Sequence, residues 1–231
     1  MDLLLQAFEN ALRLLLEFDA GLREIVWLTL QVTGTALLLA SLLGIPIGVL
    51  FGLRQKIPAK GCLLPLIYTG MGLPPVVAGL MVYMLLSNQG PMGSLRWLFT
   101  PTAMVLAQTL IALPLVVGLT ITAVQSVNPQ LRLQIEALGA TPWQMAWTIL
   151  LEARLGVLAA VLAAFGRIIA EVGAVMLVGG NIETQTRVMT TAIVLETRRG
   201  NFALALALGL ILLGMAFVLN FTLYHMERIN N

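Results

Sequence analysis

The segment FGRIIAEVG carries two ionisable side chains, Arg167 and Glu171, inside an otherwise apolar stretch at 155–182. A separation of four residues would place both on one face of a continuous helix. Ionisable groups in such a stretch are costly and usually face a bundle interior or a polar pathway. The pattern allows two interpretations: an ion pair that locks the helix, or an arginine on the route of an anion. Asn181 follows two glycines, and this run is predicted to end the helix in a left-handed conformation.

The chain offers little material for catalysis or metal binding. Cys62 is its only cysteine and His225 its only histidine, so a disulfide within the chain or a cysteine–histidine metal site cannot be built. A nucleophile activated by histidine is equally hard to assemble. The sequence also has no G-x-x-x-x-G-K-[ST] run that would cradle a nucleotide. We therefore expect no catalytic residues, no metal site and no cofactor.

Composition and long uncharged runs indicate an integral membrane protein. Hydrophobic residues make up 59% of the chain, charged residues 10%, and the mean hydropathy is +0.94. The sequence has five long runs with few or no charged residues, and each exceeds the roughly 20 residues that a helix needs to cross a hydrocarbon core of about 30 Å. The sequence thus predicts an all-α fold with five transmembrane helices in one domain, 25–225, and the net charge of +2 indicates no nucleic-acid partner. The runs are 25–53, 61–95, 97–131, 155–182 (which holds the two charges) and 200–226.

Prolines mark irregular places within these predicted spans. The stretch GLPPVVAGL at 72–80 places Pro74 and Pro75 in the middle of the second span. Each proline removes a backbone donor and disfavours helix in the residue before it, so we expect a break there. Such a break must be sheltered by other helices or line a wet cavity. Pro46 and Pro114 predict milder kinks in the first and third spans.

Residues 1–24 are predicted to form an N-terminal amphipathic helix. They lack the basic start and cleavage site of a signal peptide, and Glu9 and Glu17 interrupt the apolar residues. We expect this helix to lie in the membrane interface, in contact with lipid, or to pack across a neighbouring helix. The apolar stripe comprises Leu4, Leu5, Phe8, Leu12, Leu15 and Leu16.

The distribution of basic residues does not settle the orientation in the membrane. With the central loop on the cytoplasmic side, six arginines and lysines fall on each side, and Arg167 lies within a span. The compact cluster RQKIPAK at 54–60 favours a cytoplasmic position for that loop.

The segment 131–154 resembles the coupling loop of ATP-binding-cassette importer permeases. The family pattern runs Glu-Ala-Ala, three residues, Gly, nine residues, then Ile-x-Leu-Pro, and Gly139, Ile149 and Leu151 fit its spacing. The stretch ALGATPWQ at 137–144 is also typical of such loops.

Two departures from the family pattern occur in this segment. The Glu-Ala-Ala triplet falls on Leu-Gln-Ile at 133–135, and Glu152 stands in place of the final proline. Glu136 lies three positions later than the family glutamate. The residues expected to couple the chain to an ATPase are Glu136, Ala137, Leu138, Gly139, Ala140, Ile149 and Leu151.

Further motifs resemble the tungstate branch of the molybdate and tungstate permeases. The resemblance covers residues 25–225. TTAIVLET at 190–197 favours tungstate over molybdate. GLPPVVAGL also matches this branch. The molybdate branch shares two further motifs, the Arg-x-x-x-Glu-x-Gly spacing of Arg167, Glu171 and Gly173, and the Gly-Asn-Ile run at 180–182.

This resemblance implies a type I ABC importer permease fold and a set of partners. Two identical copies would line one pathway, and a short coupling helix at about 130–145, within the loop 128–154, would dock on a cytoplasmic ABC ATPase dimer. An extracytoplasmic oxyanion-binding protein would deliver the anion to the loop 181–202. The resemblance places the chain in the plasma or inner membrane of a prokaryote, with its N-terminus outside and its C-terminus in the cytoplasm.

Three alternatives remain open at this point. Molybdate or sulfate could be the cargo, because substrate choice in such systems rests largely with the delivering protein. A secondary transporter would work without an ATPase, and an inverted repeat would support it, but none is visible. A membrane-embedded enzyme would need an acid–base constellation, whereas the polar residues within the spans are isolated.

Overall fold

A computed structural model of the chain describes residues 2–17, 20–53 and 60–230. Every regular element in these ranges is a helix, which confirms the all-α prediction. The basic cluster at 54–60 lies almost wholly outside the described residues. The helices are α1 (Asp2–Glu17), α2 (Ala20–Leu53), α3 (Lys60–Met71), α4 (Pro75–Leu86), the 3-10 helix η1 (Gly93–Leu95), α5 (Pro101–Gln125), α6 (Pro129–Ala137), α7 (Pro142–Glu152), α8 (Arg154–Ile169), α9 (Gly173–Gly179), α10 (Met189–Arg198) and α11 (Phe202–Asn230).

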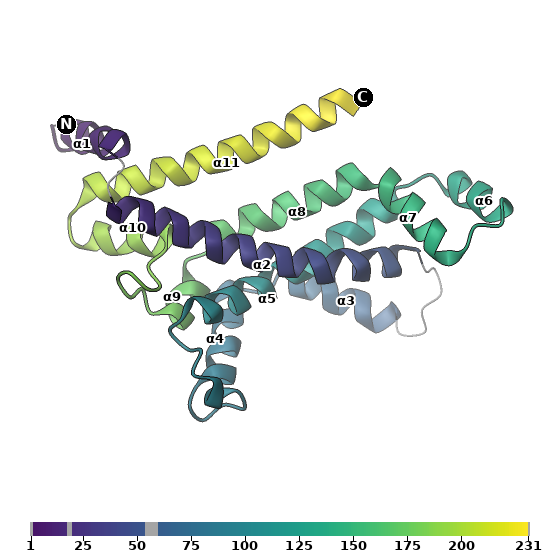
Figure 1. Cartoon of the computed structure of the whole chain (residues 1–231), viewed down its shortest axis with the longest axis horizontal. Coiled ribbons are helices and arrows are strands. Elements are labelled where there is room, and N and C mark those ends of the chain that lie inside the picture. The colour runs from purple at the N-terminus through teal and green to yellow at the C-terminus, as the bar shows by residue number, and fades with distance from the viewer. Residues whose placement is uncertain (1, 18–19, 54–59, 231) are drawn as a thin grey trace.

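Helices α2 and α5 form the centre of the bundle and pack along much of their length (Figure 1). Gly44, Gly48 and Gly52 lie four residues apart on α2 and face α5. A Cβ added to any of them would lie 2.6 to 2.9 Å from an α5 side chain. Because these residues have no side chain, the two backbones approach closely, as small residues allow in membrane helix pairs.

The described ranges contain three helices that are long and apolar enough to cross a bilayer, namely α2, α5 and the Phe202–Thr222 part of α11. Two further pairs are sharply bent: α3 with α4 by 103°, and α7 with α8 by 69°. The chain therefore has three such spans, or up to five if each bent pair counts as one. The predicted number of five spans is reached only if each bent pair counts as one span.

The second predicted span, 61–95, is not one straight helix. Helix α3 ends at Met71 and α4 begins at Pro75, with Pro74 at its N-cap. The two prolines supply no backbone donors to the turn, so the α3 hydrogen-bond ladder does not continue through it. Helix α4 runs across the direction of α2 and α5, downward in Figure 1, and ends at Leu86.

The fourth predicted span, 155–182, is also interrupted. Helix α8 ends at Ile169 and the short helix α9 begins at Gly173. Helix α9 packs against α4, where a Cβ on Gly79 would lie only 2.6 Å from the Cα of Ala174. The two short helices that follow the two breaks are thus packed together.

The predicted N-terminal segment 1–24 contains helix α1 and the start of α2. Helix α1 ends at Glu17, and α2 begins at Ala20. Helix α1 packs against α11. Glu17 accepts a 2.7 Å hydrogen bond from Arg13, and this bond together with the negative charge raises the pKa of Arg13. Leu16 is 87% exposed, and the side chains of Leu4 and Leu5 lie outside the described part, so an interfacial role stays a prediction.

Candidate coupling loop and pathway face

The loop 128–154 is an ordered pair of helices at the right-hand end of Figure 1. The side chain of Asn128 caps α6 by accepting a 2.9 Å bond from the Gln130 amide. Thr141 and Gln144 form a reciprocal capping box at the start of α7. Both caps satisfy amides that a helix start leaves without partners. The expected single coupling helix at 130–145 is therefore two helices joined by a turn.

Gly139 makes the turn between α6 and α7 possible. Its φ is +77°, a left-handed conformation that side-chain-bearing residues rarely adopt. Among the described residues, no atom lies within 4 Å of the position that a Cβ would occupy there. The turn is thus specified by its backbone conformation and is open to the surroundings.

The tip of this loop is apolar and exposed. Leu138 is 87% exposed and Leu133 65%, whereas Ile149 is fully buried and holds α7 on the bundle. Exposed leucines on a loop outside the apolar bundle are typical of a surface that a partner covers. Of the other residues predicted for coupling, Glu136 and Ala137 are exposed, Ala140 is half-buried and Leu151 is 48% exposed.

Helix α7 connects this tip to the bundle. It ends at Glu152, and after Ala153 the chain turns by 69° into α8. Helix α7 is therefore the segment that joins the tip to the start of α8.

Arg167 and Glu171 do not form an ion pair, which was one of the two interpretations of their spacing. The helix that would have placed them on one face ends at Ile169, so Glu171 lies beyond it. Glu171 is 8% exposed, and its Oε1 accepts a 3.0 Å bond from the Ala174 amide at the start of α9. A carboxylate that caps a new helix favours the break itself. Arg167 is exposed and has no ion pair with any described residue.

Arg167 lies on a face of α8 that is otherwise made of small residues. At 100° per residue, the exposed positions of α8 other than its first residue, Arg154, fall on one side of the helix. Such a face lets another helix approach closely or leaves room beside it. An exposed arginine among apolar spans needs a protein, water or ionic partner. The small residues on this side are Gly156, Ala159, Ala163, Gly166 and, just after the helix, Ala170.

Polar side chains bond backbone carbonyls at the break between α8 and α9 and at the end of α9. Thr190 donates a 2.8 Å hydrogen bond to the Glu171 carbonyl, and Thr186 donates a 2.6 Å bond to the Gly179 carbonyl. Gln108 of α5 donates a 3.1 Å bond to the carbonyl of Ile168. The Ile168 carbonyl also accepts a 3.2 Å bond from the Glu171 amide. No local sequence pattern marks Thr186, Thr190 or Gln108 for this role.

The loop after α9 has a strained backbone. Gly180 has a φ of +71°, and the non-glycine residues Asn181 and Thr184 have φ values of +53° and +60°. Asn181 therefore does adopt a left-handed conformation, and its Oδ1 is buried without a hydrogen-bond partner. Arg187 pairs with Glu183 at 3.2 Å rather than with a group in the bundle.

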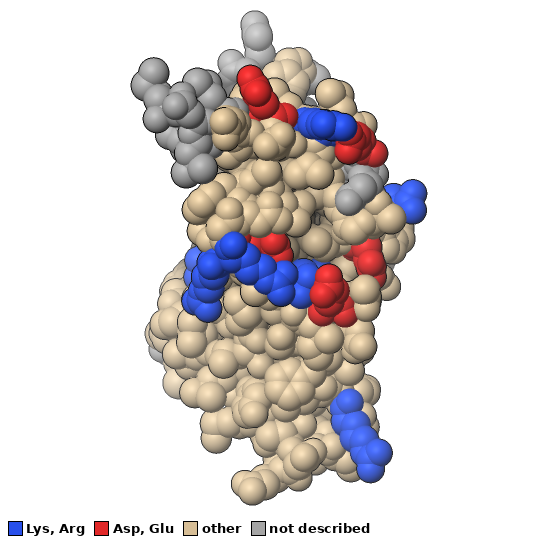
Figure 2. Space-filling view, turned by 90° about the vertical axis from the view of Figure 1, so that its left-hand side faces the viewer, with Lys and Arg blue, Asp and Glu red and all other residues tan. Residues whose placement is uncertain are grey.

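The end of the molecule opposite the coupling loop carries a band of charge. Figure 2 looks onto this end and shows basic and acidic side chains gathered across a mostly uncharged surface. Arg198 and Arg199, at the end of α10, are exposed there, and Arg199 bonds the buried Glu196 at 3.0 Å. This end can meet a hydrophilic partner.

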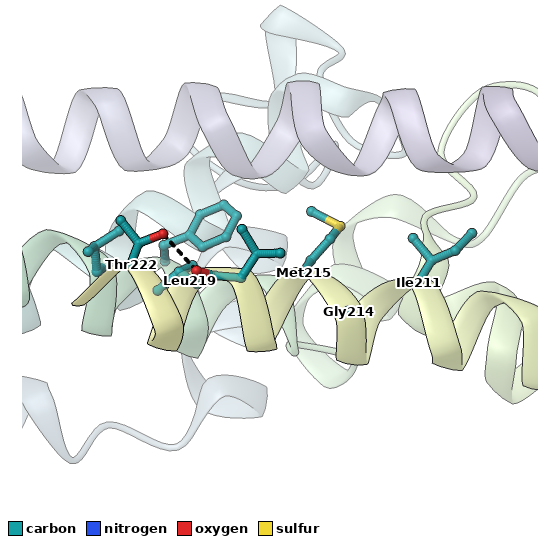
Figure 3. Close-up of a pocket in the computed structure, with 8 residues that line it drawn as sticks. Ile211, Gly214, Met215, Leu219 and Thr222 are labelled. Carbon is teal, nitrogen blue, oxygen red and sulfur yellow. Dashed lines mark hydrogen bonds between the residues drawn. The ribbon is translucent and has the colours of Figure 1, made fainter. Parts of the chain in front are cut away.

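An apolar groove of about 560 Å³ lies between α8 and α11 (Figure 3). Its one hydroxyl lining residue, Thr222, donates to the carbonyl of Val218 in its own helix. The groove thus offers no polar group to an anion. The described residues contain no cluster of three or more metal-ligating side chains.

Comparisons with known proteins identify relatives along nearly the whole chain. Residues 44–229 match the family described as binding-protein-dependent transport system inner membrane component. A probable anion ABC transporter permease protein of Haloferax volcanii is 44% identical over 210 residues, covering 87% of this chain and 90% of the relative. The tungstate uptake system permease protein TupB of Peptoclostridium acidaminophilum is 36% identical over 228 residues, covering 99% and 100%.

Solved structures share the fold at low sequence identity. A bacterial ABC transporter that imports the acidic polysaccharide alginate matches with a TM-score of 0.75 at 20% identity, covering 96% of this chain and 83% of the matched chain. This chain therefore shares its overall fold with a solved ABC transporter.

Proposed function

Since the chain belongs to the family of binding-protein-dependent transport system inner membrane components, we propose that it forms the pathway of an ATP-driven tungstate importer. It is a multi-pass membrane protein and a transport subunit rather than an enzyme. ATP hydrolysis would take place on a separate ABC ATPase, and an extracytoplasmic protein would deliver the anion.

Tungstate is proposed because a tungstate permease aligns with the chain from end to end. The motifs TTAIVLET and GLPPVVAGL support the same cargo. Molybdate and sulfate are the alternatives, since they are tetrahedral dianions of similar chemistry. A competition experiment separates the three: unlabelled tungstate should suppress uptake of labelled tungstate at lower concentration than molybdate or sulfate.

The observation that carries the ATP-driven proposal is the ordered loop with its exposed apolar tip. Leu138 is 87% exposed, and it lies beside the turn at Gly139. A water-exposed leucine at the tip of a rigid loop gains from burial in a groove of another protein. We propose that the ATPase binds this tip and that Gly139 forms the turn that exposes it.

The test is co-purification of the permease with its ATPase. Leu138→Arg should leave the permease folded, because the side chain contacts little of its own chain, and should abolish ATPase binding. Gln89→Arg, at an exposed position in the loop after α4, is the matched control and should retain the ATPase. Retention of the ATPase by Leu138→Arg would contradict the assignment of this loop.

The proposed pathway runs along the small-residue face of α8 in a homodimer. In that arrangement each copy contributes one Arg167, and two guanidinium groups match the two negative charges of the oxyanion. The support is that Arg167 is exposed and forms no ion pair with another described residue of its own copy. A fully paired arginine could not exchange partners with a moving anion so readily.

The proposed orientation places the loop 128–154 in the cytoplasm, with the N-terminus outside and the C-terminus inside. Helix α10 and the loop 181–202 would then meet the oxyanion-binding protein. The exposed Arg198 and Arg199 at the end of α10 support a polar contact there.

A further inference from the structure

A second apolar groove, of about 590 Å³, lies between the last turns of α2 and helix α7. Its volume falls in the range of roughly 300 to 1,000 Å³ that is usual for small-molecule sites. The lining residues of α7 recur at helical spacing, so one face of α7 forms that side of the groove. The lining residues are chiefly Ile45, Pro46, Leu50, Trp143, Ala146 and Trp147.

The position of this groove relative to the bilayer follows from the tryptophans. Trp27, near the start of the uncharged run of α2, is 67% exposed, and Trp143 and Trp147, beside the end of that run, are 77% and 54% exposed. Trp27 and Leu50 are separated by 23 residues, or about 35 Å of helix. This distance is close to the hydrocarbon core of about 30 Å. Exposed tryptophans at both ends are typical of the two membrane interfaces, so the groove opens at one of them.

The groove is continuous with the lipid-facing surface of α2. Leu42 and Leu43 are 67% and 51% exposed, and Ile47 and Leu50 are 38% and 45% exposed further along the same helix. An apolar chain of the bilayer lying on this surface can extend into the groove without leaving hydrocarbon surroundings. The walls present almost no polar group, so a water-exposed protein segment would gain no hydrogen bonds in the groove.

We propose that this groove binds one acyl chain of a bilayer phospholipid, with the headgroup at the interface beside Trp143 and Trp147. Helix α7 makes few contacts with α2, and the acyl chain fills the space between them. The acyl chain thereby supports α7, the helix that links the loop tip to α8. The lipid site itself requires only that the protein spans the membrane. The effect of the bound lipid on coupling rests on the proposed function.

Tryptophan fluorescence in brominated phosphatidylcholine tests the site in the assembled transporter. The substitutions Trp27→Phe, Trp97→Phe and Trp143→Phe leave Trp147 as the reporter. Brominated acyl chains should quench Trp147, and Ala146→Phe, which fills the groove, should remove most of that quenching. Ala216→Phe is the matched control, because Ala216 is exposed on α11 away from this groove, and it should leave quenching unchanged.

Native mass spectrometry gives a second readout that does not need the tryptophan substitutions. One phospholipid per permease should be retained by the unmodified transporter and by Ala216→Phe, and lost from Ala146→Phe. If Ala146→Phe does not fold, Ala146→Leu fills part of the groove and should lower lipid retention. If neither Ala146 variant changes the quenching or the lipid retention, the detected lipid is ordinary surrounding lipid and the proposal is overturned. Quenching that is seen in the permease alone and lost on ATPase binding would assign the groove to the ATPase instead.

Discussion

Gly139 has a left-handed backbone conformation and lies at the proposed docking site for the ATPase. Its φ of +77° makes any larger side chain strained, at a cost of roughly 1 to 2 kcal/mol. Because the space around it is empty in one copy, Gly139→Trp should lower permease stability by no more than this strain and yet abolish ATPase-coupled uptake.

Gly139→Asn serves as the control for the Gly139→Trp experiment, since asparagine tolerates a left-handed backbone. It should keep most of the uptake. The measurement pairs thermal unfolding of the permease with uptake by the assembled transporter. Normal uptake by Gly139→Trp would show that nothing docks at this turn.

Arg167 and Glu171 should behave as independent residues, because they do not touch. Glu171→Ala removes the cap of α9 and should lower stability by about 1 kcal/mol. Arg167→Ala should leave stability nearly unchanged and reduce uptake strongly, and Arg167→Lys should restore part of it, since lysine keeps the charge without the planar fork. Thermal unfolding and uptake of the single and double variants check this. Recovery of stability in the double variant would instead indicate a structural ion pair.

The sequence predicts the chemistry of these residues better than their geometry. An arginine and a glutamate inside an apolar stretch were recognisable as special, but their four-residue spacing implies one helical face only if the helix is continuous. The break after Ile169 depends on bonds from Thr190 and Gln108, which are distant in the sequence. No local pattern could reveal those partners.

At the scale of elements, the packing of α4 on α9 is tight enough to test. Gly79 faces the backbone of Ala174, and a Cβ there would lie at 2.6 Å. Gly79→Leu should therefore push the two helices apart and destabilise the fold by about 1 to 3 kcal/mol or more. Thermal unfolding in detergent measures this loss.

Gly34→Leu is the matched control for Gly79→Leu, because Gly34 is a helical glycine with no atom within 4 Å of an added Cβ. It should leave the unfolding temperature nearly unchanged. Equal effects of the two substitutions would show that α4 does not rest on α9.

Several elements could be read from the sequence, and their breaks only in part. The long runs of α2 and α5 follow from apolar length, whereas the close contact of α2 with α5 at Gly44, Gly48 and Gly52 was not predicted. Pro74 and Pro75 mark where α3 gives way to α4, but nothing in their chemistry sets an angle of 103°. That angle depends on where α9 and α5 offer a surface to α4.

For the whole molecule, the lone thiol reports the orientation. Cys62 is exposed near the start of α3, and the proposed topology places that end in the cytoplasm. A membrane-impermeant maleimide should label it in inverted vesicles and leave it unlabelled in intact cells. Labelling in intact cells would reverse the orientation of the whole chain.

The central claim is that this chain is the pathway of an ATP-driven oxyanion importer. The most direct measurement is tungstate accumulation in proteoliposomes that contain the permease, its ATPase and its binding protein. We expect accumulation against a gradient that requires ATP and all three components, with no uptake by the permease alone. Tungstate uptake by the permease alone, unaffected by ATP, would identify a secondary transporter and contradict the account.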